Sequence, residues 1–294
     1  MLWILLTASA APLQVARNAL QRGLLGDAGP WGATLVRFLF GLPFSLAIFT
    51  AVALATPGAA PHASARFAVA VAIGALSQIG ATAALLVAMR RAGFAVATVM
   101  QQSSLPLAAI FGWALLGDRL GPQAWAGIAT TTAGLLVLSW PRRDEMRGAA
   151  IGSVLGIASG AAFAVALNAY RQAGLAFDPH HPIYSATASV CVAQAIQTAV
   201  MVAALAVWRP GTLVAVARSW RPSLGAGLFG AAASACWFGA LALAPAGPVR
   251  AIGVIEAPIA AAAGRRLFKE RLSPRQLAGG VMAALGVAAT ALGG

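Results

Sequence analysis

The sequence predicts an all-α, polytopic membrane protein with ten transmembrane helices in two inverted five-helix repeats around a central cavity. Three observations support this fold class. Of the 294 residues, 60% are hydrophobic and only 9% are charged, whereas a soluble domain carries about 25% charged residues. The apolar runs are long enough to cross a bilayer as helices. The second half of the chain also repeats residues of the first half at a nearly constant offset.

The same composition excludes several other classes of protein. Two cysteines cannot hold a chain of this length together as a disulfide scaffold, and the apolar content is too high for disorder. The net charge of +13 would suit a nucleic-acid partner, but the basic residues separate apolar runs instead of forming one patch. We therefore expect the lipid bilayer, and no nucleic acid, as a partner.

The helices can be placed from the apolar runs. A helix that crosses about 30 Å of hydrocarbon needs about 20 apolar residues, so ten helices use roughly 200 residues and leave short loops. Residues 1–11 resemble a signal peptide, but its basic first region is missing, so they are expected to begin the first helix. The predicted spans are residues 2–21, 31–54, 66–89, 94–116, 122–140, 148–171, 182–207, 221–243, 247–266 and 275–292.

The internal repeat is clearest near the end of each half. Residues 117–122 (GDRLGP) align with residues 269–274 (KERLSP) at an offset of 152. The same offset pairs Pro106 with Pro258, Gly112 with Gly264, Gly127 with Gly279 and Gly134 with Gly286, and an offset of 150 pairs Ser9 with Ser159 and Asn18 with Asn168. An odd number of spans makes the second half enter from the opposite side. The expected repeats, 1–147 and 148–294, have the inverted arrangement typical of secondary transporters.

These motifs resemble those of a known family. The run GDRLGPQ…G…G and its counterpart KERLSPRQ…G…G are similar to the repeat-ending signature of the EamA type in the drug/metabolite transporter superfamily. The stretch Trp237–Leu241, followed by Ala246 and the run Glu256-Ala257-Pro258, resembles the family's second-half pattern. The resemblance covers essentially the whole chain. It implies ten helices around a central cavity and an exporter of small metabolites, often amino acids.

One departure from the family pattern concerns Glu256. The family often places an acid directly before the proline, whereas Ala257 separates Glu256 from Pro258 here. The first half has Ser103-Ser104-Leu105 before Pro106 and no acid. No role is therefore transferred to Glu256 from the resemblance.

The basic residues predict the topology. Fourteen Lys and Arg residues fall in the loops after odd-numbered spans and three in the loops on the other side. Because cytoplasmic loops carry the excess of Lys and Arg, both termini are expected outside, in a bacterial inner membrane. Neither a nucleophile–base arrangement nor a phosphate-binding glycine motif is visible in the sequence. We therefore expect no enzyme, no cofactor, no metal and no ATP-driven motor.

Polar residues in the predicted spans recur on narrow helix faces. The four stripes are Thr7, Gln14, Asn18 and Gln21; Gln78 and Thr82; Thr98, Gln101 and Gln102; and Tyr184, Thr187, Cys191, Gln194 and Thr198. Interhelical hydrogen bonds, worth about 0.6 kcal/mol each, would explain any one of them. Four stripes at similar depth favour a shared hydrated cavity. The predicted substrate-binding residues are Gln14, Asn18, Gln78, Gln102, Gln194, Trp237 and Glu256.

Glu256 is the only acid inside a predicted span. A charge at the bilayer centre costs at least about 2.5 kcal/mol, so it must be neutral, paired or hydrated. Three roles are open: an ion pair with Arg17, Arg37 or Arg250, a proton-coupling site, and a counter-charge for a substrate ammonium. An amino acid would need both signs, which Glu256 with Arg17 or Arg37 would supply. Cationic drugs or other small organic compounds, for which one acid suffices, are the alternative substrates.

Prolines and glycines complete the predictions. Pro106 and Pro258 hold equivalent positions in the two halves, where each removes a backbone hydrogen bond. They are expected either to gate the cavity or to give the helices a fixed bend. A face of small residues lies on the sixth span: Gly148, Gly152, Gly156 and Gly160. Such a face allows close helix contact, as an internal seam or in a dimer, so a monomer or a weak homodimer is expected.

Overall fold

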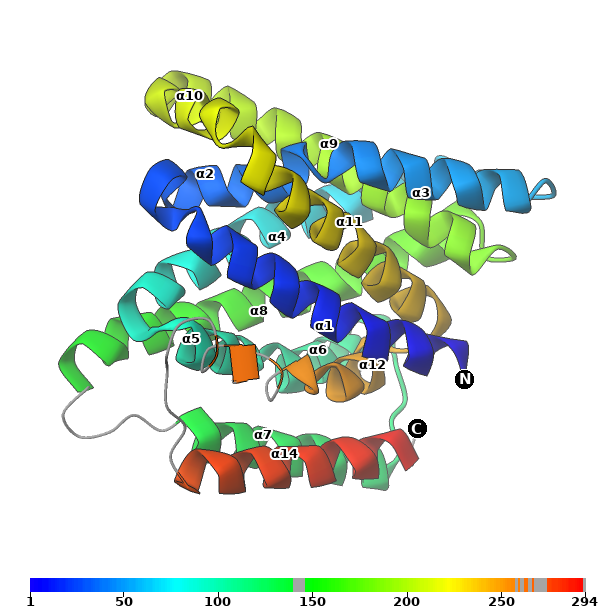
Figure 1. The fold of residues 1–294 in the computed structure, drawn as a ribbon. Coiled ribbons are helices and arrows are strands. Elements are labelled where there is room, and N and C mark those ends of the chain that lie inside the picture. Colours follow the sequence, from blue (N-terminus) through cyan, green and yellow to red (C-terminus); the bar gives the residue numbers. More distant parts are fainter. Residues whose placement is uncertain (140–145, 257–258, 260–261, 264–265, 267–273, 293–294) are drawn as a thin grey trace. The chain divides into compact units, whose positions relative to one another are not determined.

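The computed structural model describes the chain except for residues 140–145, 257–258, 260–261, 264–265, 267–273 and 293–294 (Figure 1). Every regular element in the described residues is a helix. Five helical stretches there are long and apolar enough to cross a membrane: Leu25–Ala55, Ala65–Ala92, Ala150–Phe177, Pro182–Trp208 and Trp220–Leu243. Their length and composition support a multi-pass membrane protein.

Contacts divide the chain into two compact units. Unit 1 comprises Met1–Ile79 and Ala169–Leu243, and unit 2 comprises Gly80–Asn168 and Ala244–Gly294. Each unit therefore takes residues from both halves of the sequence. The two repeats, 1–147 and 148–294, were inferred from sequence similarity rather than from contacts, and they stay a prediction.

Unit 1 is built around two long helices, α1 (Leu2–Gly23) and α11 (Trp220–Leu243), which pack against each other. The helix α9 (Pro182–Trp208) contacts α11. The other described elements of unit 1 are α2 (Leu25–Leu39), α3 (Leu42–Ala55), α10 (Pro210–Arg218), the first part of α4 (Ala65–Ala92) and the end of α8 (Met146–Phe177).

The second predicted span differs from the structure in two ways. Residues 31–54 were expected as one helix, but α2 ends at Leu39 and α3 begins at Leu42. Pro43 explains the break, because a proline without an N–H group is best placed in the first turn of a new helix. The helical stretch also begins earlier than expected, at Leu25, and it bends at Gly29, whose φ is 65°.

Unit 2 is held together by α7 (Pro122–Ser139) and α14 (Pro274–Leu292), which lie side by side. Its other described helices are α5 (Phe94–Gln101), α6 (Ser104–Leu116) and α12 (Ala246–Gly253). The glycines of α7 and α14 face the partner helix so closely that a Cβ at Gly134 would lie 2.8 Å from Gly279 O. Gly127 likewise meets Gly286, which makes the two helices antiparallel.

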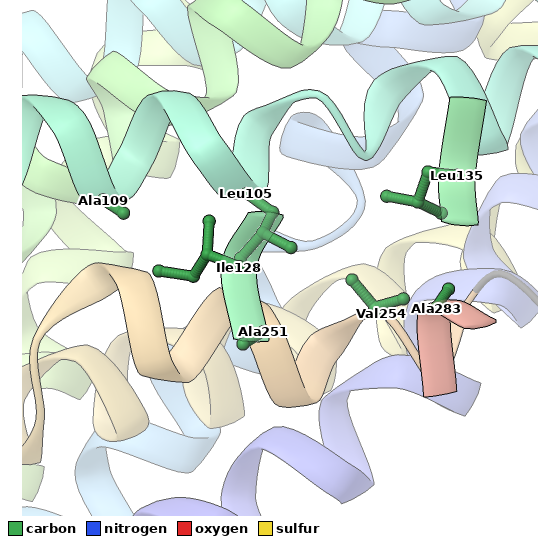
Figure 2. Close-up of a cluster of buried hydrophobic side chains, with 7 residues drawn as sticks. All are labelled: Leu105, Ala109, Ile128, Leu135, Ala251, Val254 and Ala283. Carbon is green, nitrogen blue, oxygen red and sulfur yellow. The ribbon is translucent and has the colours of Figure 1, made fainter. Parts of the chain in front are cut away.

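The apolar core of unit 2 lies where these helices meet. It consists of Leu105, Ala109, Ile128, Leu135, Ala251, Val254 and Ala283 (Figure 2). On the polar side, Thr131 Oγ1 donates to Gly127 O at 2.8 Å and approaches Ala283 O at 3.4 Å. Antiparallel packing of α7 on α14 is the direction that an inverted repeat requires of its last helices. The repeat itself stays a prediction.

The glycine face of α8 is occupied within unit 2. A Cβ at Gly152 would lie 2.5 Å from Ala92 Cβ, and one at Gly156 would lie 2.5 Å from Met100 Cβ. Gly160 meets Ser103. The surroundings of Gly148 lie outside what the structure describes. These three glycines therefore form an internal seam, the first of the two expectations for this face.

Outside the spans, Asp178 joins two loops of unit 1. Its carboxylate accepts hydrogen bonds from Ala60 N at 2.9 Å and from the backbone N–H groups of His180 and His181, and it pairs with His181 Nδ1 at 2.9 Å. Burial raises the pKa of Asp178, but the hydrogen bonds from Ala60, His181 and His180 and the charge of His181 outweigh it. The pKa of Asp178 therefore lies below its ordinary value.

Candidate functional site

Unit 1 buries the polar face of α1 against neighbouring helices. Gln14 Oε1 accepts a hydrogen bond from Trp237 Nε1 of α11 at 2.8 Å. Two turns along the same helix, Gln21 Nε2 donates to Ala33 O of α2 at 2.7 Å. The shared face predicted from the spacing is therefore an interhelical one, and it joins two predicted substrate-binding residues, Gln14 and Trp237.

Two arginines lie buried in unit 1. The Arg17 guanidinium donates to Asn18 Oδ1 at 2.6 Å, and the Arg37 guanidinium lies 5.3 Å from the Phe38 ring centroid. Both stems pass the same residue of α11, since a Cβ at Gly230 would lie 3.3 Å from Arg17 Cδ and 3.4 Å from Arg37 Cγ. The glycine gives two long cationic side chains room to enter the helix packing together.

A second polar centre of unit 1 joins α4, α8 and α9. Gln78 Oε1 accepts from Tyr170 Oη at 3.0 Å and from Gln197 Nε2 at 2.7 Å. Gln197 Nε2 also lies 3.2 Å from Ala75 O. The Tyr170 ring fills the space beside Gly74, where a Cβ would lie 2.5 Å from Tyr170 Cε1.

Gln194 makes a separate contact on α9. It accepts a hydrogen bond through Oε1 from Ser45 Oγ of α3 at 2.8 Å. The side chain also lies against Gly41, where a Cβ would be 3.2 Å from the amide. Gln194 and Gln197 therefore belong to different polar contacts, although the two residues are three positions apart on one helix.

The charged cluster of unit 2 is centred on Arg250 of α12. Its Nε donates to Ser104 Oγ at 2.7 Å, and its Nη2 donates to Gln102 Oε1. Its Nη1 lies 3.5 Å from Glu256 Oε2. The side chain of Glu256 is fully buried, so the pair is removed from solvent. Of the three arginines considered for Glu256 from the sequence, the structure pairs it with Arg250.

A break in the helix supplies two ligands of this cluster. The span predicted at 94–116 is interrupted, because α5 ends at Gln101 and α6 begins at Ser104. Pro106 lies in the first turn of α6 and has no N–H group to continue an unbroken helix. The interruption places Gln102 and Ser104 beside Arg250. Pro258, predicted as the equivalent gating residue, lies outside the described residues.

The structure therefore groups the predicted residues by unit. Gln14, Asn18, Gln78, Gln194, Trp237, Arg17 and Arg37 belong to unit 1, and Gln102, Pro106 and Glu256 belong to unit 2. Convergence of Gln14, Gln78, Gln102 and Gln194 on one cavity stays a prediction. Three hydrogen-bonding residues of these polar contacts were not predicted as site residues: Tyr170, Gln197 and Ser104. Gln197 lies one turn after Gln194 on the same helix, and this spacing could have predicted it as a member of the same polar stripe.

The described part of the chain also holds cysteine, histidine and acidic side chains outside these polar contacts. No group of three His, Cys, Asp or Glu side chains gathers there as it would around a metal ion. Cys191 and Cys236 are both free thiols.

The five candidate spans are apolar helices, and three buried glutamines, Gln78, Gln194 and Gln197, lie in them. They support a polytopic membrane protein. Residues 1–140 match the EamA-like transporter family. This match supports the resemblance to the drug/metabolite transporter superfamily over the first half of the chain. A solved structure described as "Crystal structure of protein" aligns with 98% of this chain and 96% of its own length. Its TM-score is 0.64 and its identity is 20%, so it shows the fold alone. No curated protein matches the sequence.

Proposed function

We propose that the chain is a secondary transporter that exports small metabolites across the inner membrane by alternating access, with amino acids as the favoured substrate class. The single observation that carries the proposal is the Arg250–Glu256 pair, buried with Gln102 and Ser104. The match of residues 1–140 to EamA-like transporters supports membrane transport as the general class, and transport rather than catalysis.

The mixed sign of the cluster favours a zwitterionic substrate. Arg250 and Glu256 are oppositely charged, so together they add no net charge to the interior of the helices. A zwitterion that binds between them places its carboxylate beside Arg250 and its ammonium beside Glu256. Because it has no net charge itself, the total charge stays zero. The 3.5 Å separation of Nη1 and Oε2 is longer than the 2.7–2.9 Å of a tight charged hydrogen bond. Exchange of partners therefore breaks a comparatively weak contact.

Export of cationic drugs is the alternative function, and the complete burial of Glu256 favours it. In that function the substrate cation competes with Arg250 for the carboxylate. The two functions differ in the role of Arg250. A cation exporter needs only the acid, whereas an amino-acid exporter needs the guanidinium as well.

Coupling and gating belong to the same proposal. Proton coupling through Glu256, with Arg17 or Arg37 as further charges, would make transport depend on the pH gradient. Pro106 and Pro258 would let the helices bend between the two conformations. Counterflow with and without an imposed pH gradient separates coupled from facilitated transport.

Proteoliposomes test the proposal directly. Vesicles containing the full chain are loaded with unlabelled substrate, and uptake of radiolabelled neutral, acidic and basic amino acids is compared with uptake of tetraphenylphosphonium. Glu256→Gln should abolish counterflow, while the matched variant Asp27→Asn, at an exposed acid, should keep it. Counterflow of tetraphenylphosphonium without any amino acid would favour the alternative. If no compound exchanges, the proposed function is wrong.

A second experiment locates the path. Cysteine replaces Gln14, Gln78, Gln102 or Gln194 in a chain without Cys191 and Cys236. A small water-soluble thiol reagent should modify all four positions, and substrate should slow the reaction. If the four cysteines stay unmodified in a chain that still transports, the amides serve packing alone.

A further inference from the structure

The helix α10 occupies a place where the sequence predicted only a loop. It runs from Pro210 to Arg218 and links α9, which ends at Trp208, to α11, which begins at Trp220 (Figure 1). Both neighbours are long and apolar enough to cross a membrane. Because α10 joins the ends of two candidate spans, it belongs at the surface of the bilayer rather than in its hydrocarbon core.

One side of α10 is fixed on unit 1. Val216 is buried, and its Cγ2 would lie 3.2 Å from a Cβ at Gly32 of α2. Thr212, one turn earlier, would lie 3.0 Å from the same Cβ. The absent side chain at Gly32 thus lets α10 lie close to α2, which fixes the direction of the opposite face.

The opposite side is open and basic. Val214 is 50% exposed, and Arg218, one turn later, is exposed beside it. Arg209, directly before α10, and Arg221, in the first turn of α11, are exposed as well. No acidic residue occurs in the sequence between Asp178 and Glu256. These three arginines therefore form a positive surface without a neighbouring acid in the sequence.

Two tryptophans lie on either side of α10 in the sequence, at the end of α9 and at the start of α11. Trp208 is 80% exposed and Trp220 is 47% exposed. The Arg221 guanidinium lies 5.3 Å from the Trp220 ring centroid. Exposed tryptophans at the ends of spans sit at the level of the lipid headgroups, where the ring has an apolar and a wet side. The arginines that accompany them therefore lie at the depth of the lipid phosphates.

We propose that α10, with Arg209, Arg218 and Arg221 and the two flanking tryptophans, binds the headgroups of anionic phospholipids. The guanidinium groups bind the phosphates in the bidentate geometry that suits them. Val214 and the indoles enter the boundary of the acyl chains, as in other interfacial amphipathic helices. Charge and depth select this occupant: an acidic protein would match the arginines but would leave the tryptophans and Val214 exposed.

Lipid titration of the purified, delipidated full chain tests the proposal. Native mass spectrometry measures the binding of dioleoyl phosphatidylglycerol and of dioleoyl phosphatidylcholine. The chain should prefer phosphatidylglycerol. Since a basic residue near an anionic surface contributes about 1 kcal/mol, or about fivefold, R218Q should weaken phosphatidylglycerol binding about fivefold. The variant R209Q/R218Q/R221Q should weaken it roughly a hundredfold.

Exposed arginines elsewhere provide the matched control. R90Q/R91Q/R119Q removes the same charge from other exposed positions and should keep the preference for phosphatidylglycerol. An equal loss in the control would make the preference a property of net charge and overturn the proposal. Equal affinity of the unaltered chain for both lipids would overturn it too. Size-exclusion profiles and the R218Q variant keep the test valid if the triple variant folds poorly.

Discussion

Replacing Arg250 with methionine perturbs the buried charged cluster most directly. The guanidinium donates to Ser104 Oγ at 2.7 Å and to Gln102, and lies 3.5 Å from Glu256 Oε2. Removing one member of a buried ion pair leaves an uncompensated charge and costs about 3–5 kcal/mol. Ser104→Ala instead removes one hydrogen bond to a charged group, worth about 1.5–3 kcal/mol. R250M should therefore lower the free energy of unfolding by more than S104A does.

The double variant R250M/E256Q separates charge from packing. Both charges are gone, and replacing a whole buried pair is often neutral, so the double variant should recover most of the stability that R250M loses. Unfolding in detergent, followed by circular dichroism during titration with sodium dodecyl sulfate, gives the three free energies. Counterflow of the double variant should be absent if the proposed function is right, because both charges proposed to hold the substrate are missing.

Two results would refute this reasoning. If R250M loses no more stability than S104A, then Glu256 does not depend on Arg250 for its charge. If R250M/E256Q transports amino acids at the full rate, the pair is structural and the substrate is held elsewhere. The second result would remove the observation on which the proposed function rests.

Three further predictions follow from other parts of the chain. Both termini should face the periplasm, so a C-terminal alkaline phosphatase fusion should be active and a green fluorescent protein fusion dark; the reverse would contradict the charge count. Since the pKa of Asp178 lies below its ordinary value of 3.8, its stabilisation is complete above that pH and is lost as the pH falls through the lowered pKa. The protection factor of the Ala60 amide against hydrogen exchange should therefore fall in acid, and Asp178→Asn should lower it at every pH. Gly134→Ala should destabilise the α7–α14 contact by about 1–3 kcal/mol, while Gly80→Ala, with open space around its Cβ, should stabilise by about 0.5–1 kcal/mol; equal effects would contradict the packing argument.

Much of the helical pattern was predictable because membrane spans are long, apolar and bounded by charges. The predicted span 182–207 and the helix Pro182–Trp208 nearly coincide. The errors lie where hydropathy gives no signal. The breaks before Pro43 and Pro106 fall inside continuous apolar runs, and proline chemistry, rather than polarity, sets them. The helix α10 has only nine residues, which is too short for a membrane span, so its residues were assigned to a loop.

The candidate site was predictable in its helix faces but not in its contacts. Spacing along α1 correctly grouped Gln14, Asn18 and Gln21 on a buried face. Their partners come from distant parts of the chain: Gln14 and Trp237 are 223 positions apart. Neither periodicity nor the repeat offsets determine such pairs. Arg250 was one of three arginines that the sequence offered to Glu256, and the structure pairs Glu256 with this one, six positions earlier in the chain.

The amide of Gln194 offers a last test of packing against transport. Its Oε1 accepts from Ser45 Oγ at 2.8 Å, while its Nε2 is buried and has no hydrogen-bond partner among the described residues. An unsatisfied buried group costs about 1–3 kcal/mol, and replacing both partners with apolar groups removes that cost. S45A/Q194L should therefore be as stable as the unaltered chain or more so, whereas Ser45→Ala alone should be less stable. A residue kept at such a cost is explained if its free N–H groups bind substrate or water in another conformation. The double variant should then lose counterflow while its free energy of unfolding rises, and full transport by a stabilised S45A/Q194L chain would assign Gln194 to packing.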